Sequence, residues 1–207
     1  MFTRFEAHFC QDGGTRTKSN GPLAHAQEPT TDALVCRLGG ASFNNGLYRI
    51  MTPEIVAWGN AFVANAFTGF SDRVQAFAFD WLGRVFALDS ARIEGGRPGV
   101  VLFEPGTGEA LEIPCNLSTF HENELVDYKE EALAEGFYRR WLANGGAAPN
   151  VDQCVGYKTP LFLGGKDTIE NLEISDLDVY WTLVAQLLAK VRGLPLGTRI
   201  RKVEIES

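Results

Sequence analysis

The sequence lacks long apolar runs and a recognisable export signal. No stretch approaches the ~18 consecutive apolar residues that a membrane-spanning helix needs. The N-terminus, MFTRFEAH, has no continuous apolar core of the kind that a signal peptide carries. These two absences lead us to expect a cytoplasmic protein that does not contact a membrane.

Cysteine and histidine are scarce and scattered. The four cysteines stand at positions 10, 36, 115 and 154 without a Cys-x-x-Cys pair, and the three histidines do not follow zinc-ligand spacing. Free thiols in a reducing compartment account for this pattern better than a disulfide framework does. The sequence therefore predicts neither a bound metal nor any other cofactor.

Basic residues are outnumbered by acidic ones. The chain has 19 Lys and Arg against 26 Asp and Glu, which gives a formal net charge of −7. Nucleic-acid-binding proteins usually carry a basic stripe, because phosphate contacts supply most of their affinity. The balance argues against direct nucleic-acid binding and suits a basic protein partner, although many acidic proteins use such charge only for solubility.

The composition is otherwise that of a globular protein. The chain has 207 residues, of which 45% are hydrophobic, and this is enough to bury a substantial core. Phe2, Phe5 and Phe9 have helical spacing and predict a short amphipathic helix. Small and polar residues dominate positions 11–31, so residues 1–31 as a whole are predicted to form an N-terminal arm or loop.

Local signals predict a helix and two hairpins in the first half of the chain. The motif TPE at 52–54 combines a hydroxyl cap, a proline at the first helical position and an early acid, as helix starts do. Hairpins are predicted over 74–89 and over 99–114. In the first strand of the first hairpin, strict alternation would place Phe77 and Phe79 on the same face.

The second half mixes helical and strand patterns. A helix is predicted over 121–144 and a buried strand over 155–163. Ser175, with Asp178 three residues later, resembles the capping box of a further helix, and residues 199–205 alternate like a final edge strand. Short hairpins between helices predict an α+β fold, with a mainly antiparallel sheet built from hairpins and flanked by helices.

Two stretches begin like catalytic motifs and fail at a required position. GGKD at 164–167 would need a glycine where Pro160 stands and a Ser or Thr where Asp167 stands to be a phosphate loop. HENEL at 121–125 has a leucine where a metalloprotease helix has its second histidine. We therefore expect no enzyme, since a hydrolase would need a buried His121 beside a thiol or a carboxylate.

Two segments concentrate acidic residues. Residues 120–135 and 166–178 each contain several carboxylates and a single lysine. Such segments are either solvated faces or an anionic surface that attracts a basic partner and speeds encounter.

Trp81 and Arg84 flank the turn of the first predicted hairpin. Tryptophan and arginine are typical anchors of protein interfaces. Alternatively, Trp81 caps the core and Arg84 pairs with Asp80 or Asp89. The predicted partner-binding residues are Trp81, Arg84, Glu130, Glu131, Glu135, Lys166, Asp167, Glu170 and Asn171.

Several separated motifs resemble one bacterial family. GLYRI at 46–50 and FDWLGR at 79–84 resemble a GAD-like module, whereas CVGY at 154–157 and LFLGGKD at 161–167 resemble the C-terminal module that accompanies it. The two modules occur together in immunity proteins of type VI secretion DNase toxins. The resemblance divides the chain into an N-terminal arm (1–31), a GAD-like module (32–115) and a C-terminal immunity module (116–207), with the last two packed as one structural unit.

The resemblance implies a cytoplasmic antitoxin. Such a protein binds a cognate toxin, here a nuclease with a basic surface, and neutralises it without catalytic residues of its own. The alternative is a small-ligand or nucleic-acid-binding sensor domain, which a deep pocket with converging polar groups would favour.

Overall fold

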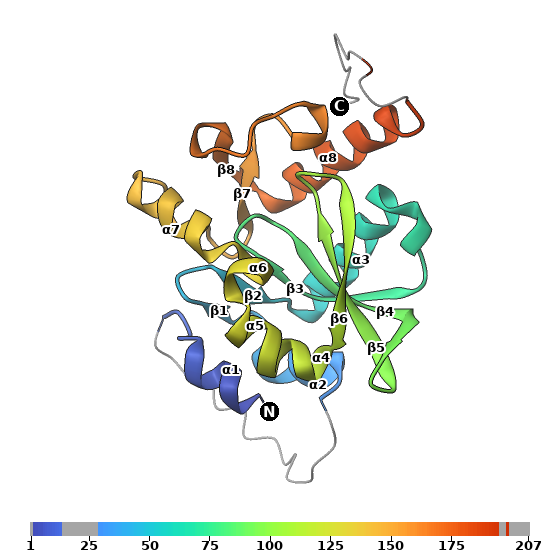
Figure 1. Cartoon of the computed structure of the whole chain (residues 1–207), viewed down its shortest axis with the longest axis vertical. Coiled ribbons are helices and arrows are strands. Elements are labelled where there is room, and N and C mark those ends of the chain that lie inside the picture. The colour runs from blue at the N-terminus through green and yellow to red at the C-terminus, as the bar shows by residue number, and fades with distance from the viewer. Residues whose placement is uncertain (1, 14–28, 195–197, 199–207) are drawn as a thin grey trace.

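The computed structural model describes residues 2–13, 29–194 and 198. They form a six-stranded sheet with helices on both faces and a separate two-stranded sheet (Figure 1). Every strand pair in both sheets is antiparallel. The predicted α+β class with a mainly antiparallel sheet is confirmed. The edge strand predicted over 199–205 lies outside the described residues, as do residues 14–28.

The large sheet is a meander in which each strand pairs with the next one along the chain. Both predicted hairpins are present, as the pairs β3–β4 and β5–β6. The strands are β1 (Ser42–Phe43), β2 (Tyr48–Ile50), β3 (Val74–Asp80), β4 (Val85–Glu94), β5 (Arg97–Glu104) and β6 (Glu109–Asn116).

A bulge in β3 overturns the predicted alternation. The register of β3 against β4 shifts between Ala76 and Ala78. Because a bulge inserts an extra residue, it reverses the faces beyond it. Phe77 therefore packs in the core on one side of the sheet and Phe79 in the core on the other.

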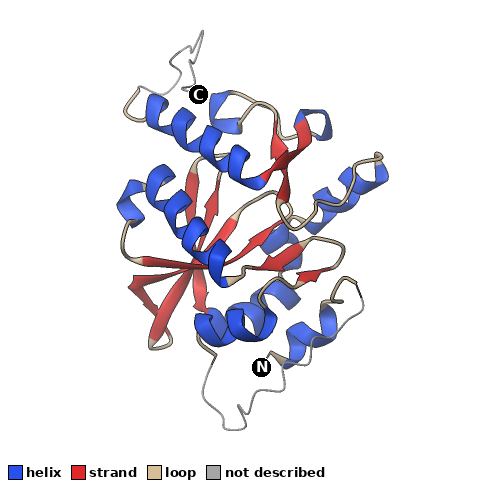
Figure 2. Cartoon of the chain, turned by 180° about the vertical axis from the view of Figure 1, so that it is seen from behind, coloured by secondary structure: helices blue, strands red, loops and turns tan. Residues whose placement is uncertain are grey.

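Two long helices cover one face of the sheet. They are α3 (Pro53–Ala66), followed by a 3-10 helix (Thr68–Phe70), and α8 (Leu177–Val191), and Figure 2 shows both in front of the strands. The predicted start of α3 is confirmed, because the Thr52 side chain accepts a hydrogen bond from the backbone N–H of Ile55. Phe62 of α3 stacks on Trp181 of α8, with ring centroids 5.7 Å apart.

Shorter helices pack into the core on the other face. Phe2, Phe5 and Phe9 are buried there, so the helix predicted in the first ten residues is confirmed. This corrects the predicted arm over 1–31, whose first residues belong to the core and whose last residue begins a helix. The elements on this side are α1 (Thr3–His8), α2 (Thr31–Leu38), α4 (Leu117–Thr119), a π-helix (Phe120–Glu124), α5 (Leu125–Asp127), α6 (Lys129–Leu133) and α7 (Glu135–Ala143).

The single helix predicted over 121–144 is wrong, because the structure breaks it into several pieces. The last break is at Ala134, which adopts a left-handed conformation with φ +50°. The carbonyl oxygen of Leu133 accepts a hydrogen bond from the indole of Trp81. That bond holds the end of α6 against the sheet, and the chain turns at Ala134 before α7 begins.

The two-stranded sheet consists of β7 (Gln153–Tyr157) and β8 (Leu172–Asp176). The strand predicted over 155–163 therefore ends at Tyr157, and the 3-10 helices Leu161–Leu163 and Ile169–Asn171 lie between β7 and β8. Asp176 caps α8 in place of the predicted Ser175, because its carboxylate accepts hydrogen bonds from the backbone N–H groups of Asp178 and Val179.

Candidate functional site

The turn 80–84, which contains the predicted anchors Trp81 and Arg84, is buried. Trp81 is fully buried and donates a hydrogen bond from Nε1 to the carbonyl oxygen of Leu133, 2.9 Å away. Its ring lies against Tyr138, with centroids 4.8 Å apart. Neither anchor can touch a partner in this structure, which corrects the prediction that Trp81 and Arg84 form an interface.

Arg84 pairs with Asp80 inside the core. Its Nε lies 2.6 Å from Asp80 Oδ2, and its Nη2 donates to the carbonyl oxygen of Ala132 at 3.0 Å. Burial raises the pKa of Asp80, and the attraction of the Arg84 guanidinium opposes that rise. Of the two alternatives for the Arg84 partner, the structure selects Asp80.

Turn 80–84 also receives contacts from the last third of the chain. The indole Nε1 of Trp181 donates to the carbonyl oxygen of Gly83 at 2.8 Å, and Val155 N–H donates to the carbonyl oxygen of Trp81 at 2.7 Å. Gly83 has φ +73°, and a Cβ there would lie 3.0 Å from the Cys154 side chain. The motif FDWLGR therefore packs against the last third of the chain, through Cys154, Val155 and Trp181.

Arg49 is a second buried residue that connects the first half of the chain to the last third. Its guanidinium donates to the carbonyl oxygens of Asn150, Gln153 and Asp80 at 2.6, 2.7 and 2.9 Å. Burial lowers the pKa of Arg49 to about 10. In the sequence, Arg49 stood out only as part of the motif GLYRI. Its role was missed, because the three carbonyl oxygens that it binds come from residues far away in the chain.

The acidic segment 120–135 is partly neutralised by contacts within the chain. Glu130 accepts a hydrogen bond from the backbone N–H of Gly136 at 2.6 Å. Glu135 lies 3.8 Å from the Lys129 ammonium and 3.6 Å from the Arg139 guanidinium. Of the three predicted glutamates, Glu131 is exposed and has no such contact.

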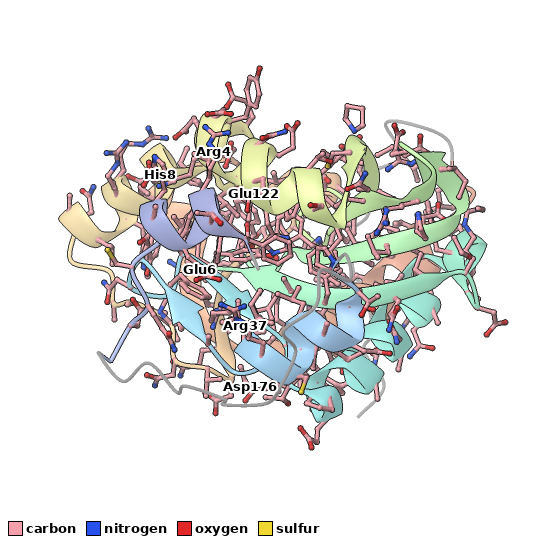
Figure 3. All side chains as sticks on the ribbon, turned by 90° about the horizontal axis from the view of Figure 1, so that it is seen from below. Arg4, Glu6, His8, Arg37, Glu122 and Asp176 are labelled. Carbon is pink, nitrogen blue, oxygen red and sulfur yellow. The ribbon has the colours of Figure 1, made fainter. Side chains whose placement is uncertain are left out.

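Arg4 of α1 neutralises the beginning of the same segment. Its guanidinium makes two hydrogen bonds to the Asp127 carboxylate, at 2.6 and 2.9 Å, and its backbone N–H donates to Glu122 at 3.0 Å. Figure 3 shows Arg4 beside Glu122, while Glu6 on the other side of α1 faces Arg37 of α2. Sequence reasoning missed Arg4, since its partners lie more than a hundred residues away.

Loop 158–171 holds the other predicted residues in a fixed shape. Asn171 accepts a hydrogen bond from Thr159 N–H at 3.0 Å, and its amide donates to the carbonyl oxygens of Thr159 and Lys166, both at 2.9 Å. Asp167 accepts from the Tyr157 hydroxyl at 2.7 Å. Asn171 is therefore a brace of this loop, which presents the exposed side chains of Lys166, Asp167 and Glu170.

The loop rests on the turn between β5 and β6, where carboxylates gather. Backbone N–H groups of Leu161 and Phe162 donate to the carbonyl oxygen of Gly106 at 2.8 and 3.3 Å. Burial raises the pKa of Glu104, the last residue of β5, and the charges of Asp80, Glu109 and Asp167 add to the rise while Arg84 opposes it. Of these carboxylates, Glu109 and Asp167 are exposed, so they are the negative charges that this part of the surface presents.

His121, the residue that a hydrolase would need, is engaged in core packing. Its ring is fully buried, stacks on Phe2 with centroids 4.3 Å apart, and hydrogen-bonds the Tyr48 hydroxyl and the Leu117 carbonyl oxygen at 3.0 and 2.9 Å. Burial lowers its pKa to about 4, so the ring is neutral at physiological pH. Neither hydrogen-bond partner is a thiol or a carboxylate.

An open groove of about 380 Å³ lies between the end of α3 and the end of α8. Its lining is largely apolar and includes Phe67, Phe70 and Leu188. The cation in it, Arg192, already donates to the carbonyl oxygen of Ala66 at 2.8 Å. A ligand pocket usually has several convergent polar groups, and this groove does not supply them.

Residues 2–13, 29–194 and 198 contain neither a metal-binding cluster nor a membrane-spanning helix. No group of three or more His, Cys, Asp or Glu side chains in this part of the chain is arranged to hold a metal ion. None of its helices has both the length and the apolar character needed to cross a membrane.

One family model matches a segment in the second half of the chain. Residues 116–188 match the family model described as "T6SS immunity protein Tdi1, C-terminal". This confirms the resemblance to type VI secretion immunity proteins over that segment. The GAD-like module and the boundaries 32–115 and 116–207 stay predictions.

Solved structures show the same fold. The crystal structure of Atu4351 from Agrobacterium tumefaciens aligns with a TM-score of 0.52 and 20% sequence identity, over 70% of this chain and 69% of that chain. At this identity the match shows a common fold alone. A comparison with curated proteins gave no match.

Proposed function

We propose that this chain, whose residues 116–188 match the family model of the type VI secretion immunity protein Tdi1, neutralises a cognate DNase toxin by binding it in the cytoplasm. The family match carries the proposal. The chain acts by stoichiometric binding and performs no chemistry of its own. This agrees with the placement of His121, Asp80 and Arg84, which are used for packing.

Binding relies on exposed carboxylates. Glu131 on α6 and the Asp167 and Glu170 side chains of loop 158–171 face solvent. A DNase presents Lys and Arg side chains to DNA phosphates, so a fixed anionic surface attracts the same groups and covers them. Trp81 and Arg84 contribute indirectly, because they hold the end of α6 in place through Leu133 and Ala132.

The direct test is co-expression of this chain with the toxin-like gene next to its own. We expect a one-to-one complex in a pull-down and restored growth of cells that express the toxin. Cells that die despite normal levels of the folded chain, together with no complex, would refute the proposal.

A charge reversal then tests the anionic surface. Glu131→Lys is the clean variant, since Glu130 and Glu135 are bonded within the chain. The matched control is Asp152→Lys, on another exposed acid outside both acidic segments. We expect Glu131→Lys to slow association at low salt by roughly 2- to 10-fold, and the control to leave the rate nearly unchanged. If the two variants change the association rate equally, Glu131 is not part of the binding surface.

The sensor alternative finds no specific support. A sensor domain would have a deep pocket with converging polar groups. The groove beside Arg192 is instead open and largely apolar.

A further inference from the structure

The two edges of the six-stranded sheet differ. At the β1 edge, Gln11 forms an isolated β-bridge with Phe43, and Asp12 N–H donates to the carbonyl oxygen of Ser42 at 2.8 Å. At the other edge, β6 pairs with β5 on its inner side. Within residues 2–13, 29–194 and 198, no strand or β-bridge lies along its outer side. Backbone groups on that side can therefore pair with another strand, except at Pro114, which has no N–H to donate.

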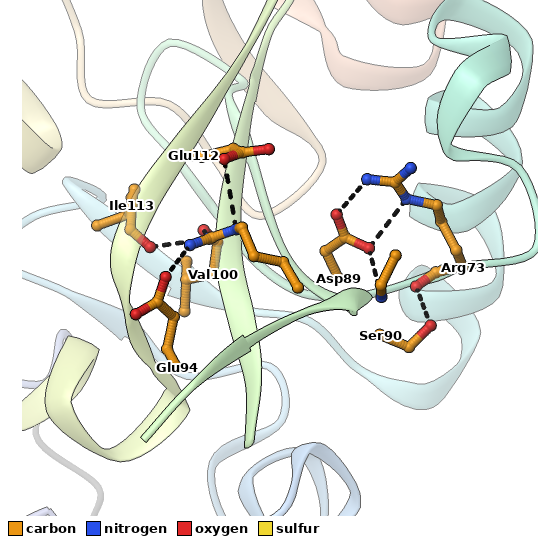
Figure 4. Close-up of polar contacts among 9 residues, drawn as sticks. Arg73, Asp89, Ser90, Glu94, Val100, Glu112 and Ile113 are labelled. Atoms are coloured by element: carbon orange, nitrogen blue, oxygen red, sulfur yellow. Dashed lines mark hydrogen bonds and ion pairs between the residues drawn. The ribbon is translucent and has the colours of Figure 1, made fainter. Parts of the chain in front are cut away.

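Arg92 braces this edge from within the sheet. Its guanidinium donates to the carbonyl oxygens of Val100 on β5 and Ile113 on β6, the latter at 2.8 Å, and pairs with Glu94 at 2.6 Å (Figure 4). It fills the space above Gly99, where a Cβ would lie 2.7 Å from the guanidinium carbon. Arg92 thus ties β5 to β6, and an edge that is already held in place loses little entropy when a strand adds to it.

The exposed side chains of β6 define what can bind there. Glu109 and Glu112 are exposed and acidic, and Leu111 between them is 42% exposed. The Glu112 carboxylate lies 3.8 Å from Arg92 Nε, so its charge is partly neutralised within the chain, whereas that of Glu109 is not paired in this way with a cation of the described residues. The beginning of β6 adjoins the carboxylates of Glu104 and Asp167, because loop 158–171 rests on the preceding turn. The edge therefore offers one apolar side chain flanked by negative charges.

We propose that the outer edge of β6 binds an extended, cationic segment of the toxin, which adds to the sheet as a seventh strand. This inference rests on the proposed function and assigns the contact surface within it. Backbone hydrogen bonds supply the pairing, as in other cases of strand addition. Lys or Arg side chains of the added strand lie opposite Glu109 and Glu112, and an apolar side chain covers Leu111.

The charges exclude the other occupants of an open edge. A second copy of this chain would pair β6 with β6 about a two-fold axis and bring like carboxylates together, which is unfavourable. Nucleic acid would place phosphates against Glu109, Glu112 and Asp167. A basic strand is the occupant whose charge complements the edge.

The test compares an edge variant with a matched control in binding to the product of the neighbouring toxin-like gene. The edge variant is Leu111→Lys with Glu112→Lys. The control is Val151→Lys with Asp152→Lys, also an exposed apolar residue followed by an exposed acid. We expect the edge variant to weaken binding by about 10-fold or more and the control by less than about 2-fold. Hydrogen exchange of the unaltered chain gives a second readout, in which the β6 amides that point away from β5 become protected only in the complex.

The outcomes separate this inference from the proposed function. If the unaltered chain binds and protects cells but its β6 amides exchange as in the free protein, the edge is not the contact and the immunity function stands. Equal binding by the edge variant and the control would also overturn the edge assignment. If the unaltered chain neither binds nor protects, both proposals fail. Because the exchange measurement needs no variant, misfolding of the edge variant cannot hide the result.

Discussion

The indole Nε1 of Trp181 donates a hydrogen bond to the carbonyl oxygen of Gly83 across 2.8 Å, although the two residues are 98 positions apart in the chain. Both residues are buried. The bond ties the last described helix, α8, to the turn of the first hairpin, so the matched segment 116–188 depends on residues outside it for its packing.

Replacing Trp181 with phenylalanine keeps an aromatic ring but removes the donor. A buried carbonyl oxygen left without a partner costs about 1–3 kcal/mol, and the smaller ring adds a loss of packing. We expect Trp181→Phe to lower the free energy of unfolding by at least that amount in chemical denaturation. The control is Trp58→Phe, because Trp58 is only half-buried. A similar loss in both variants would mean that the bond to Gly83 contributes little.

Gly83→Ala tests the close approach at turn 80–84. Gly83 and Gly96 both have positive φ, +73° and +80°, but a Cβ at Gly96 meets nothing within 4 Å, whereas at Gly83 it lies 3.0 Å from Cys154. The backbone term alone is about 1–2 kcal/mol. Gly96→Ala should show that loss in thermal or chemical unfolding. Gly83→Ala should show it together with a further cost of about 1–3 kcal/mol from overpacking. Indistinguishable losses would argue against tight packing at the turn.

The ion pair between Arg73 and Asp89 predicts a pH dependence. The buried Asp89 carboxylate accepts hydrogen bonds from Arg73 Nε at 2.9 Å and from Ala91 N–H at 3.0 Å (Figure 4). Burial by itself raises the pKa of Asp89, but these bonds outweigh it and hold the pKa below its ordinary value. A carboxylate with a lowered folded-state pKa stabilises the fold above its unfolded pKa of about 3.9, and this contribution disappears as the pH falls through the folded-state pKa.

Asp89→Asn should therefore cost about 1.5–3 kcal/mol of unfolding free energy at pH 7, and the difference from the unaltered chain should shrink below about pH 4. Urea denaturation at a series of pH values measures it. The control is Ser90→Ala, which removes the neutral hydrogen bond from Ser90 Oγ to the Arg73 carbonyl oxygen. The effect of Ser90→Ala should not vary with pH. A pH-independent effect of Asp89→Asn would contradict the assignment.

Asn171→Ala tests whether Asn171 is a brace of loop 158–171. The variant removes the hydrogen bonds to Thr159 and Lys166. We expect faster hydrogen exchange throughout the loop and a loss of global stability of only about 1 kcal/mol, because the residue is partly exposed. Thr168→Ala, an exposed position in the same loop, is the control. If exchange in the loop does not change, Asn171 is not a brace, and its prediction as a residue that contacts the partner directly would stand.

Local signals in the sequence were sufficient for the elements that local interactions form. The start of α3 at Thr52 and the hairpins β3–β4 and β5–β6 depend on capping, turn residues and alternation, all within a few positions. The same reasoning failed over 121–144, where the chain breaks at the left-handed Ala134, next to the Leu133 carbonyl oxygen that Trp81 holds. It also failed in β3, because a bulge is not visible in the alternation of apolar residues.

The sequence by itself determined that turn 80–84 is unusual and that the chain is acidic, and its family motifs pointed to an immunity protein. Only the tertiary structure decided that Trp81 and Arg84 are buried, that Arg4 and Lys129 neutralise part of the acidic segment, and that β6 has an open edge. Burial and pairing depend on which distant residues meet. Arg84 reaches Ala132 and Arg4 reaches Asp127 only after the chain has folded, so no local pattern could assign those roles.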